Sequence, residues 1–228
     1  MNTGYDAQVY GIDLFDSSVE LIESLQQSGH RVVCYFSAGS YEDWREDGDR
    51  FTAADLGDPM GDWPGENWLD IRTQNVRDIM TDRLVLAKAK DCDGVEPDNI
   101  DGYTNPTGLP LTYADQLDYN RFLAETAHSL DLAIALKNDL SQVLDLVGYF
   151  DMAINEQCHK YNECHLLQPF IDAGKPVFNA EYGSKYVTDP VARDALCASS
   201  RLFGMHTLIL PLELDDSFRL DCGAPQAH

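Results

Sequence analysis

The sequence predicts an α/β fold, a closed (β/α)8 barrel of the TIM type, formed by a single domain over residues 1–228. Short runs rich in β-forming residues alternate with helical patterns along the chain, which is the order of a parallel sheet with crossover helices. The 228 residues, 44% of them hydrophobic, are enough to build one large core. An open doubly wound sheet is the structural alternative, but no G-x-G-x-x-G follows the first expected strand to hold a dinucleotide.

Each expected element follows from its local pattern. The β-rich runs predict strands over 9–13, 32–36, 68–71, 94–97, 133–137, 152–156, 176–181 and 207–212. Apolar residues at three- and four-residue spacing predict helices over 17–28, 76–90, 112–129, 164–173 and 190–200. One long connection, 37–67, is rich in Asp, Gly, Trp and Pro. Because long loops in compact domains are usually functional, we expect this one at the active-site face.

The charge of the chain restricts its partners. Asp and Glu number 39 against 16 Lys and Arg, which gives a net charge of −23. Such a charge argues against nucleic acid or anionic membrane lipid as a partner and favours a cationic one. The alternative is that the charge serves only to keep the protein soluble.

The cysteines indicate an oxidising compartment. Their number is six, and Cys158 and Cys164 are spaced too widely for the usual paired zinc-ligand turn but well for a local disulfide. No run approaches the roughly 20 apolar residues of a membrane helix. We therefore expect an extracellular, secreted protein without a membrane partner.

Polar or ionisable residues lie at the ends of nearly all expected strands. They are Asp13, Tyr35, Ser37, Asp70, Arg72, Glu96, Asp98, Lys137, Asp139, Asn155, Glu156, Asn179 and Glu181. Strand side chains alternate, so Glu96 shares a side with Asp98, and the ends of barrel strands meet at one mouth. A single such carboxylate is more often a helix cap or a surface charge. A ring of them indicates a site, because buried charge is costly unless it is paired or used.

Two chemistries suit such a ring. Glycoside hydrolysis needs one carboxylic acid and one carboxylate, and divalent metal binding could use the same oxygens. None of the six histidines falls at a strand end, which disfavours a metal. Aromatic rings, which suit the apolar faces of sugars, gather in the same loops. They are Tyr41, Trp44, Trp63, Trp68, Tyr103, Tyr161 and Tyr182. Trp63 and Trp68 have the alternative role of anchoring the long loop.

Six segments carry a family resemblance. They are VVCYFSAGSYEDWR (32–45), WPGENWLDIR (63–72), DGVEPDNIDGY (93–103), LKND (136–139), NEQC (155–158) and VFNAEY (177–182). On these segments the chain resembles glycoside hydrolase family 114, the endo-α-1,4-polygalactosaminidases. The resemblance implies a barrel enzyme that cuts α-1,4-linked galactosamine or N-acetylgalactosamine units within a microbial exopolysaccharide. A partly deacetylated polymer of this kind carries ammonium groups, so an anionic cleft would attract it.

The resemblance also implies the site residues. The catalytic carboxylates fall on Asp98 and Glu156, with Glu156 favoured as acid/base and Asp98 as nucleophile or charge stabiliser. Retention of configuration is favoured, no cofactor and no metal are expected, and the protein is expected to be a monomer. The expected substrate-binding residues are Asp13, Tyr35, Ser37, Asp70, Arg72, Glu96, Asn99, Asp101, Tyr103, Lys137, Asn138, Asn155, Glu181 and Tyr182.

Two points keep alternatives open. Alongside the Cys158–Cys164 bridge we expect disulfides Cys197–Cys222 and Cys34–Cys92, although Cys34 could be an ordinary buried thiol on a strand. The function alternatives are a non-catalytic carbohydrate-binding barrel and a metal-dependent sugar-processing enzyme that uses Glu96, Asp98 and Glu181.

Overall fold

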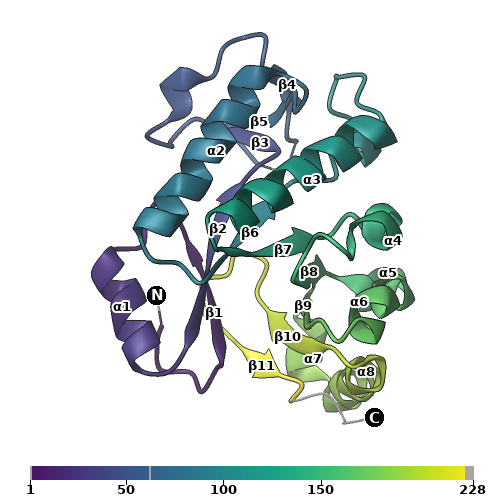
Figure 1. The fold of residues 1–228 in the computed structure, drawn as a ribbon. Coiled ribbons are helices and arrows are strands. Elements are labelled where there is room, and N and C mark those ends of the chain that lie inside the picture. Colours follow the sequence, from purple (N-terminus) through teal and green to yellow (C-terminus); the bar gives the residue numbers. More distant parts are fainter. Residues whose placement is uncertain (1, 62, 224–228) are drawn as a thin grey trace. The chain divides into compact units, whose positions relative to one another are not determined.

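The structure, a computed structural model, describes residues 2–61 and 63–223 (Figure 1). The described residues form two compact units, one on each side of the boundary between Lys137 and Asn138. The domain expected over 1–228 also includes residues 1, 62 and 224–228, which lie outside the described part. Within the described residues no helix is long and apolar enough to cross a membrane.

The first unit is built on four parallel strands. In spatial order they are β1 (Val9–Asp13), β2 (Arg31–Ser37), β6 (Gly94–Asp98) and β7 (Ala133–Lys137). The register sets Tyr35 of β2 beside Asp13 on one side and beside Glu96 on the other. It also sets Ser37 beside Asp98. The polar strand ends of this unit are therefore neighbours along one edge of the sheet.

Three helices connect these strands, and each begins at a side-chain cap. They are α1 (Val19–Gln27), α2 (Gln74–Ala89) and α3 (Tyr113–Ser129), with α2 and α3 packed side by side (Figure 1). Ser18 and Thr73 cap α1 and α2, and Thr112 forms a capping box with Asp115 at α3. These caps satisfy backbone N–H groups that the first helical turn leaves without partners.

The strand expected over 68–71 is wrong as a barrel strand. Strand β5 (Glu66–Leu69) lies instead in a small antiparallel sheet, between β3 (Ser40–Glu42) and β4 (Leu56–Pro59). Trp68, Leu69 and Ile71 are buried, as the apolar pattern required. Because a local pattern reports burial and not the partner strand, it could not distinguish the two sheets. The long connection therefore has its own sheet and a short 3-10 helix, Gly48–Arg50.

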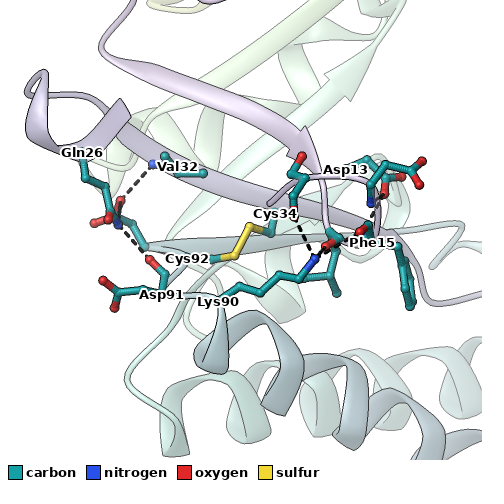
Figure 2. The surroundings of a disulfide bond; sticks show 12 residues. Asp13, Phe15, Gln26, Val32, Cys34, Lys90, Asp91 and Cys92 are labelled. Carbon is teal, nitrogen blue, oxygen red and sulfur yellow. Dashed lines mark hydrogen bonds between the residues drawn. A yellow bond between two sulfur atoms is a disulfide. The ribbon is translucent and has the colours of Figure 1, made fainter. Parts of the chain in front are cut away.

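A disulfide ties β2 to the loop that precedes β6. Cys34 of β2 is bonded to Cys92, as expected, and Figure 2 shows its surroundings. The ammonium of Lys90 donates to the backbone carbonyls of Leu14, Phe15 and Ser17 at 2.7, 3.1 and 2.8 Å. The bridge and this lysine fix the end of α2 against the turn that follows β1.

The second unit also has a sheet with helices. Strands β8 (Met152–Glu156), β9 (Val177–Tyr182) and β10 (His206–Leu210) are parallel, and β11 (Leu220–Asp221) pairs antiparallel with β10. The helices are α4 (Val143–Leu146), α5 (Cys158–Tyr161), α6 (Gln168–Asp172), α7 (Lys185–Thr188) and α8 (Pro190–Phe203). Three further short 3-10 helices span Gly102–Thr104 in the first unit and Leu140–Gln142 and Cys164–Leu167 in the second.

Two disulfides hold the second unit, in the expected pairings. Cys197 of α8 is bonded to Cys222 beyond β11, inside a buried cluster with Tyr186, Leu196 and Ile209. Cys158 of α5 is bonded to Cys164. The described residues contain no free cysteine, so the buried-thiol alternative for Cys34 is wrong.

Candidate functional site

Asp98 ends strand β6, and four hydrogen bonds hold it. Its backbone carbonyl accepts from the N–H groups of Ala38 and Gly39 at 2.9 and 3.1 Å. Its Oδ1 accepts from the N–H of Asn99 at 2.7 Å, and its Oδ2 accepts from the ammonium of Lys137 at 3.2 Å. The side chain is 17% exposed. The carboxylate is thus held in one orientation and remains within reach of solvent.

Lys137, at the end of β7, is shared between two carboxylates. Its ammonium lies 2.9 Å from Oε1 of Glu96 as well as 3.2 Å from Asp98. The ring of Tyr35 lies beside it, with its centroid 5.6 Å from the ammonium nitrogen. Burial and the nearby Asp98 raise the pKa of Tyr35, so its hydroxyl stays protonated. A single ammonium between two carboxylates leaves a local excess of negative charge, which suits a cationic ligand.

The turn after β6 depends on a close backbone approach. Asn99 has φ +60°, in the left-handed region that asparagine tolerates better than most residues. A Cβ atom added to Gly39 would come within 1.7 Å of the carbonyl oxygen of Asn99. Only glycine therefore allows the loop after β2 to lie against this turn.

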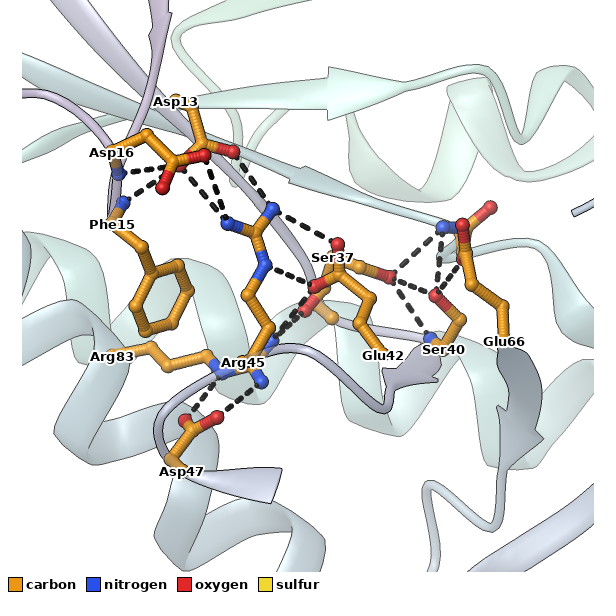
Figure 3. Close-up of polar contacts among 12 residues, drawn as sticks. Asp13, Phe15, Asp16, Ser37, Ser40, Glu42, Arg45, Asp47, Glu66 and Arg83 are labelled. Carbon is orange, nitrogen blue, oxygen red and sulfur yellow. Dashed lines mark hydrogen bonds and ion pairs between the residues drawn. The ribbon is translucent and has the colours of Figure 1, made fainter. Parts of the chain in front are cut away.

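A chain of side-chain hydrogen bonds leaves this turn. The amide nitrogen of Asn99 donates to the Ser37 hydroxyl at 2.9 Å, and the Ser37 and Ser40 hydroxyl oxygens are 2.6 Å apart. Ser40 donates to Oε2 of Glu66 at 2.7 Å; Figure 3 shows both serines and Glu66. Burial raises the pKa of Glu66, and the negative charges of Glu42 and Asp98 add to this effect against the opposing Ser40 hydrogen bond.

Asp13 is held in an ion pair. Its two oxygens accept from Arg45 at 3.1 and 2.7 Å, and Arg45 also binds Glu42 at 2.9 Å (Figure 3). Burial alone would raise the pKa of Asp13, but Arg45 and the backbone N–H groups of Phe15 and Asp16 outweigh it and lower the pKa. Asp13 is thereby bound to Arg45 of the long connection, and its expected contact with substrate stays a prediction.

Arg83 of α2 is the second buried cation of this network. It is 1% exposed, and it binds both oxygens of Asp47 at 2.8 Å and the carbonyl of Ser37 at 2.7 Å. The ring of Phe15 lies 4.8 Å from the guanidinium of Arg45 and 5.1 Å from that of Arg83. These contacts join the end of β2, the helix α2 and the long connection.

Four expected substrate contacts lie further along the chain of the first unit. Asp70 and Arg72 follow β5, which lies in the small antiparallel sheet, so they do not end a barrel strand as expected. They bind each other, with two contacts of 2.7 Å. Asp101 and Tyr103 lie in the turn after β6, where the Tyr103 ring packs edge-on against Tyr113 at 5.6 Å.

In the second unit, Glu156 ends β8 and is bound through both oxygens. Oε1 accepts from the hydroxyl of Tyr182 at 2.6 Å, and Oε2 accepts from the amide of Asn138 at 3.2 Å. The oxygen of Asn138 accepts in turn from the backbone N–H of Glu156 at 2.9 Å and from Asn155 at 3.2 Å. Asn138 thus contacts Glu156 twice and fixes its orientation.

Glu181 has a different environment. It is 1% exposed, and it accepts from the backbone N–H of His159 at 2.8 Å and from Asn179 at 3.2 Å. Burial raises its pKa despite these hydrogen bonds. These contacts hold the start of helix α5, and the expected binding of substrate by Glu181 stays a prediction.

One group of residues with metal-ligand spacing differs from the Glu96, Asp98 and Glu181 of the metal alternative, which stays an alternative. Among the described residues, Cys158, His159 and Cys164 form a group with metal-ligand spacing. The two cysteines are joined in a disulfide, so their sulfur atoms are not thiolate ligands.

The expected sugar-binding aromatic residues differ in how far their side chains are exposed to solvent. Trp68 is buried and anchors the small sheet, as the alternative role proposed. Trp44, Trp63 and Tyr161 are 54%, 48% and 59% exposed, so their faces are open to a ligand. Sequence reasoning missed Ser40, Glu66 and Arg83 as residues of this region, because a serine and a glutamate in an expected loop and an arginine in an expected helix carry no local signal.

Comparison with known proteins identifies the family. The model of glycoside hydrolase family GH114 matches residues 1–225. The chain belongs to this family. It is a glycoside hydrolase, as the six segments indicated.

Solved structures of similar proteins have the same fold as this chain. The crystal structure of Aspergillus fumigatus Ega3 in complex with galactosamine is 44% identical, covers 97% of this chain and 90% of its own, and has a TM-score of 0.93. The glycoside hydrolase domain of PelA from Pseudomonas aeruginosa, at 15% identity, covers 93% and 90% with a TM-score of 0.72 and shows the fold alone. The expected α/β fold class of TIM-barrel type is confirmed by these similarities. No match was found among curated proteins.

Proposed function

We propose that this GH114 hydrolase cuts α-1,4-linked galactosamine and N-acetylgalactosamine units within an exopolysaccharide. The observation that carries the proposal is its 44% identity, over 97% of the chain, to Ega3, whose crystal structure contains galactosamine. The net charge of −23 supports a cationic polymer as substrate. The exposed rings of Trp44, Trp63 and Tyr161 supply faces for stacking on sugars.

We assign the catalytic roles to Asp98 and Glu156. In a retaining hydrolase one group protonates the leaving oxygen and later activates water, while the other attacks the anomeric carbon. We assign the acid/base role to Glu156, which accepts hydrogen bonds from Tyr182 and Asn138. Asp98, bound by Lys137 and the N–H of Asn99, takes the role of nucleophile or charge stabiliser.

The surrounding residues then bind the sugar. Glu96 and Lys137 supply charged groups beside Asp98, and Asn99, held by the buried Ser37 hydroxyl, supplies the polar group of the turn after β6. Three disulfides support an extracellular location. We further propose that the protein is a monomer and needs no metal or cofactor.

The test uses Asp98→Asn, Glu156→Gln and the exposed helix variant Glu23→Gln as control, on purified galactosamine-containing exopolysaccharide. Mass spectrometry of the products should show oligomers released by the wild type and the control, with and without chelator. Both catalytic variants should lose at least about 10²-fold in turnover while retaining polymer binding, because the amide neither donates the proton nor attacks. Failure of the wild type to release oligomers, or loss of its activity with chelator, would overturn the proposal.

A further inference from the structure

The hydrogen-bond chain from Asn99 to Glu66 has a fixed direction. A hydroxyl has one hydrogen and two lone pairs. The Ser37 oxygen accepts from the backbone N–H of Ser40 at 3.0 Å and from the Asn99 amide at 2.9 Å. With both lone pairs occupied, Ser37 donates its hydrogen to Ser40, 2.6 Å away.

Glu66 sets this direction from the far end. The hydrogen of Ser40 goes to Oε2 of Glu66 at 2.7 Å, and an ionised carboxylate only accepts. The amide of Asn99 must then direct its nitrogen toward Ser37. In the part of the chain that the structure describes, the amide oxygen of Asn99 accepts no hydrogen bond, so it is left for another donor.

Without an acceptor at position 66, the donor-to-acceptor direction of these hydrogen bonds can reverse. Ser40 would donate to Ser37, Ser37 would donate to the oxygen of Asn99, and the amide would rotate by half a turn. The amide nitrogen would then replace the oxygen as the group left for a ligand. Charged residues around Glu66 do not offer Ser40 a substitute acceptor in the described hydrogen bonds, since Glu42 is bound to Arg45.

We infer that Glu66, acting through Ser40 and Ser37, orients the Asn99 amide so that its oxygen accepts a hydrogen bond from an ammonium or hydroxyl group of the sugar bound beside Asp98. The inference rests on the proposed function for the identity of that sugar. Glu66 is a positioning residue in this arrangement, because it acts through three other side chains.

Direct binding of the sugar by Glu66 predicts the opposite order of variant effects. Oε1 of Glu66 accepts no hydrogen bond within the described residues, so this oxygen could itself bind a sugar ammonium. Glu66→Gln would then impair binding, because the charge is lost, and Ser40→Ala would have little effect. Positioning requires the reverse order, because the amide oxygen of glutamine can still accept from Ser40.

The activity experiment compares Ser40→Ala, Glu66→Leu, Glu66→Gln and Asn99→Ala, with Glu23→Gln as control, on one galactosamine polymer. Ser40→Ala and Glu66→Leu should raise KM about 10-fold at little change in kcat, the effect of one substrate hydrogen bond. Glu66→Gln should restore KM to within about 3-fold of the wild type. Adding Ser40→Ala to Asn99→Ala should raise KM no further, because both act through the same amide. An impaired Glu66→Gln beside a normal Ser40→Ala would overturn the inference.

A second readout does not need activity. The side-chain NH₂ resonances of Asn99, assigned by their loss in Asn99→Ala, should shift in Ser40→Ala and Glu66→Leu and stay near the wild-type position in Glu66→Gln. Unchanged resonances in Ser40→Ala, with thermal unfolding showing a folded variant, would overturn the inference. An inactive wild type with the expected NMR shifts would instead refute the proposed substrate and leave the orienting role of Glu66 standing.

Discussion

The hydroxyl of Tyr182 donates a hydrogen bond of 2.6 Å to Oε1 of Glu156. The two residues end neighbouring parallel strands, β9 and β8, and Asn138 binds the other oxygen of Glu156. Each carboxylate oxygen therefore has its own donor, and the donors come from different elements.

Tyr182→Phe should lower kcat/KM on the polymer about 10- to 100-fold, because it removes one donor from Glu156 with little change in packing. Steady-state kinetics on a galactosamine polymer measures the effect. Tyr161→Phe is the matched control, since Tyr161 is an exposed tyrosine of the same unit and phenylalanine keeps the ring face proposed to stack on sugar. Equal kinetics for Tyr182→Phe and the wild type would show that this hydrogen bond does not serve turnover.

Arg83→Leu should lower the free energy of unfolding by about 3 to 5 kcal/mol, because it leaves the largely buried carboxylate of Asp47 without its partner. Arg50→Ala breaks an ion pair with Asp82 whose side chains are 44% and 60% exposed, and it should cost at most about 1 kcal/mol. Urea titrations of both variants give the comparison. A cost for Arg83→Leu no greater than that for Arg50→Ala would contradict the buried network.

Removal of each disulfide should lower the free energy of unfolding, and the loss should increase with the length of the loop that the disulfide closes. The pairs are 58, 25 and 6 residues apart for Cys34–Cys92, Cys197–Cys222 and Cys158–Cys164. Loop-closure entropy then gives about 4, 3.5 and 2.4 kcal/mol. Paired Cys→Ala variants, unfolded by urea without reductant, would show this ranking, and a larger cost for the six-residue pair would argue against an entropic origin.

The stability of Glu181→Gln should depend on pH differently from that of the wild type. Burial raises the pKa of Glu181 in the folded state, so its protonation favours folding. This contribution is fully present below the ordinary pKa of 4.5 and is lost as the pH rises through the raised value. The wild type should thus gain stability relative to Glu181→Gln as the pH falls from 7 toward 4.5. Urea titrations at several pH values test this, and parallel stability curves would refute it.

The strands could be predicted from sequence because their pattern is local. The bounds of β1, β7 and β8 agree with the expected 9–13, 133–137 and 152–156. The strand expected over 68–71 was assigned to the wrong sheet, because its partner strands depend on how the whole long connection folds. The short elements β3, β4, β11, α4, α5 and α7 were missed, since two to four residues are too few for a periodic pattern.

The candidate site could be predicted only where it follows the strands. Alternation along β6 set Glu96 on the side of Asp98, and Lys137 contacts both. The link from Ser40 to Glu66 joins residues 26 positions apart through the antiparallel pairing of β3 with β5. No spacing rule covers such a pair, and the same holds for the contact of Arg83 with Asp47 across 36 positions.

The buried ion pairs of Arg45 and Arg83 hold the long connection in one conformation. To move it as a lid, the protein would have to expose Arg83, Asp47 and Glu42 together, at the cost of separating buried charges. A polymer arriving from solution thus meets a surface that is already assembled. Capture of successive chain segments would then follow a single exponential whose rate is proportional to polymer concentration, with no slow isomerisation of the protein before or after each encounter.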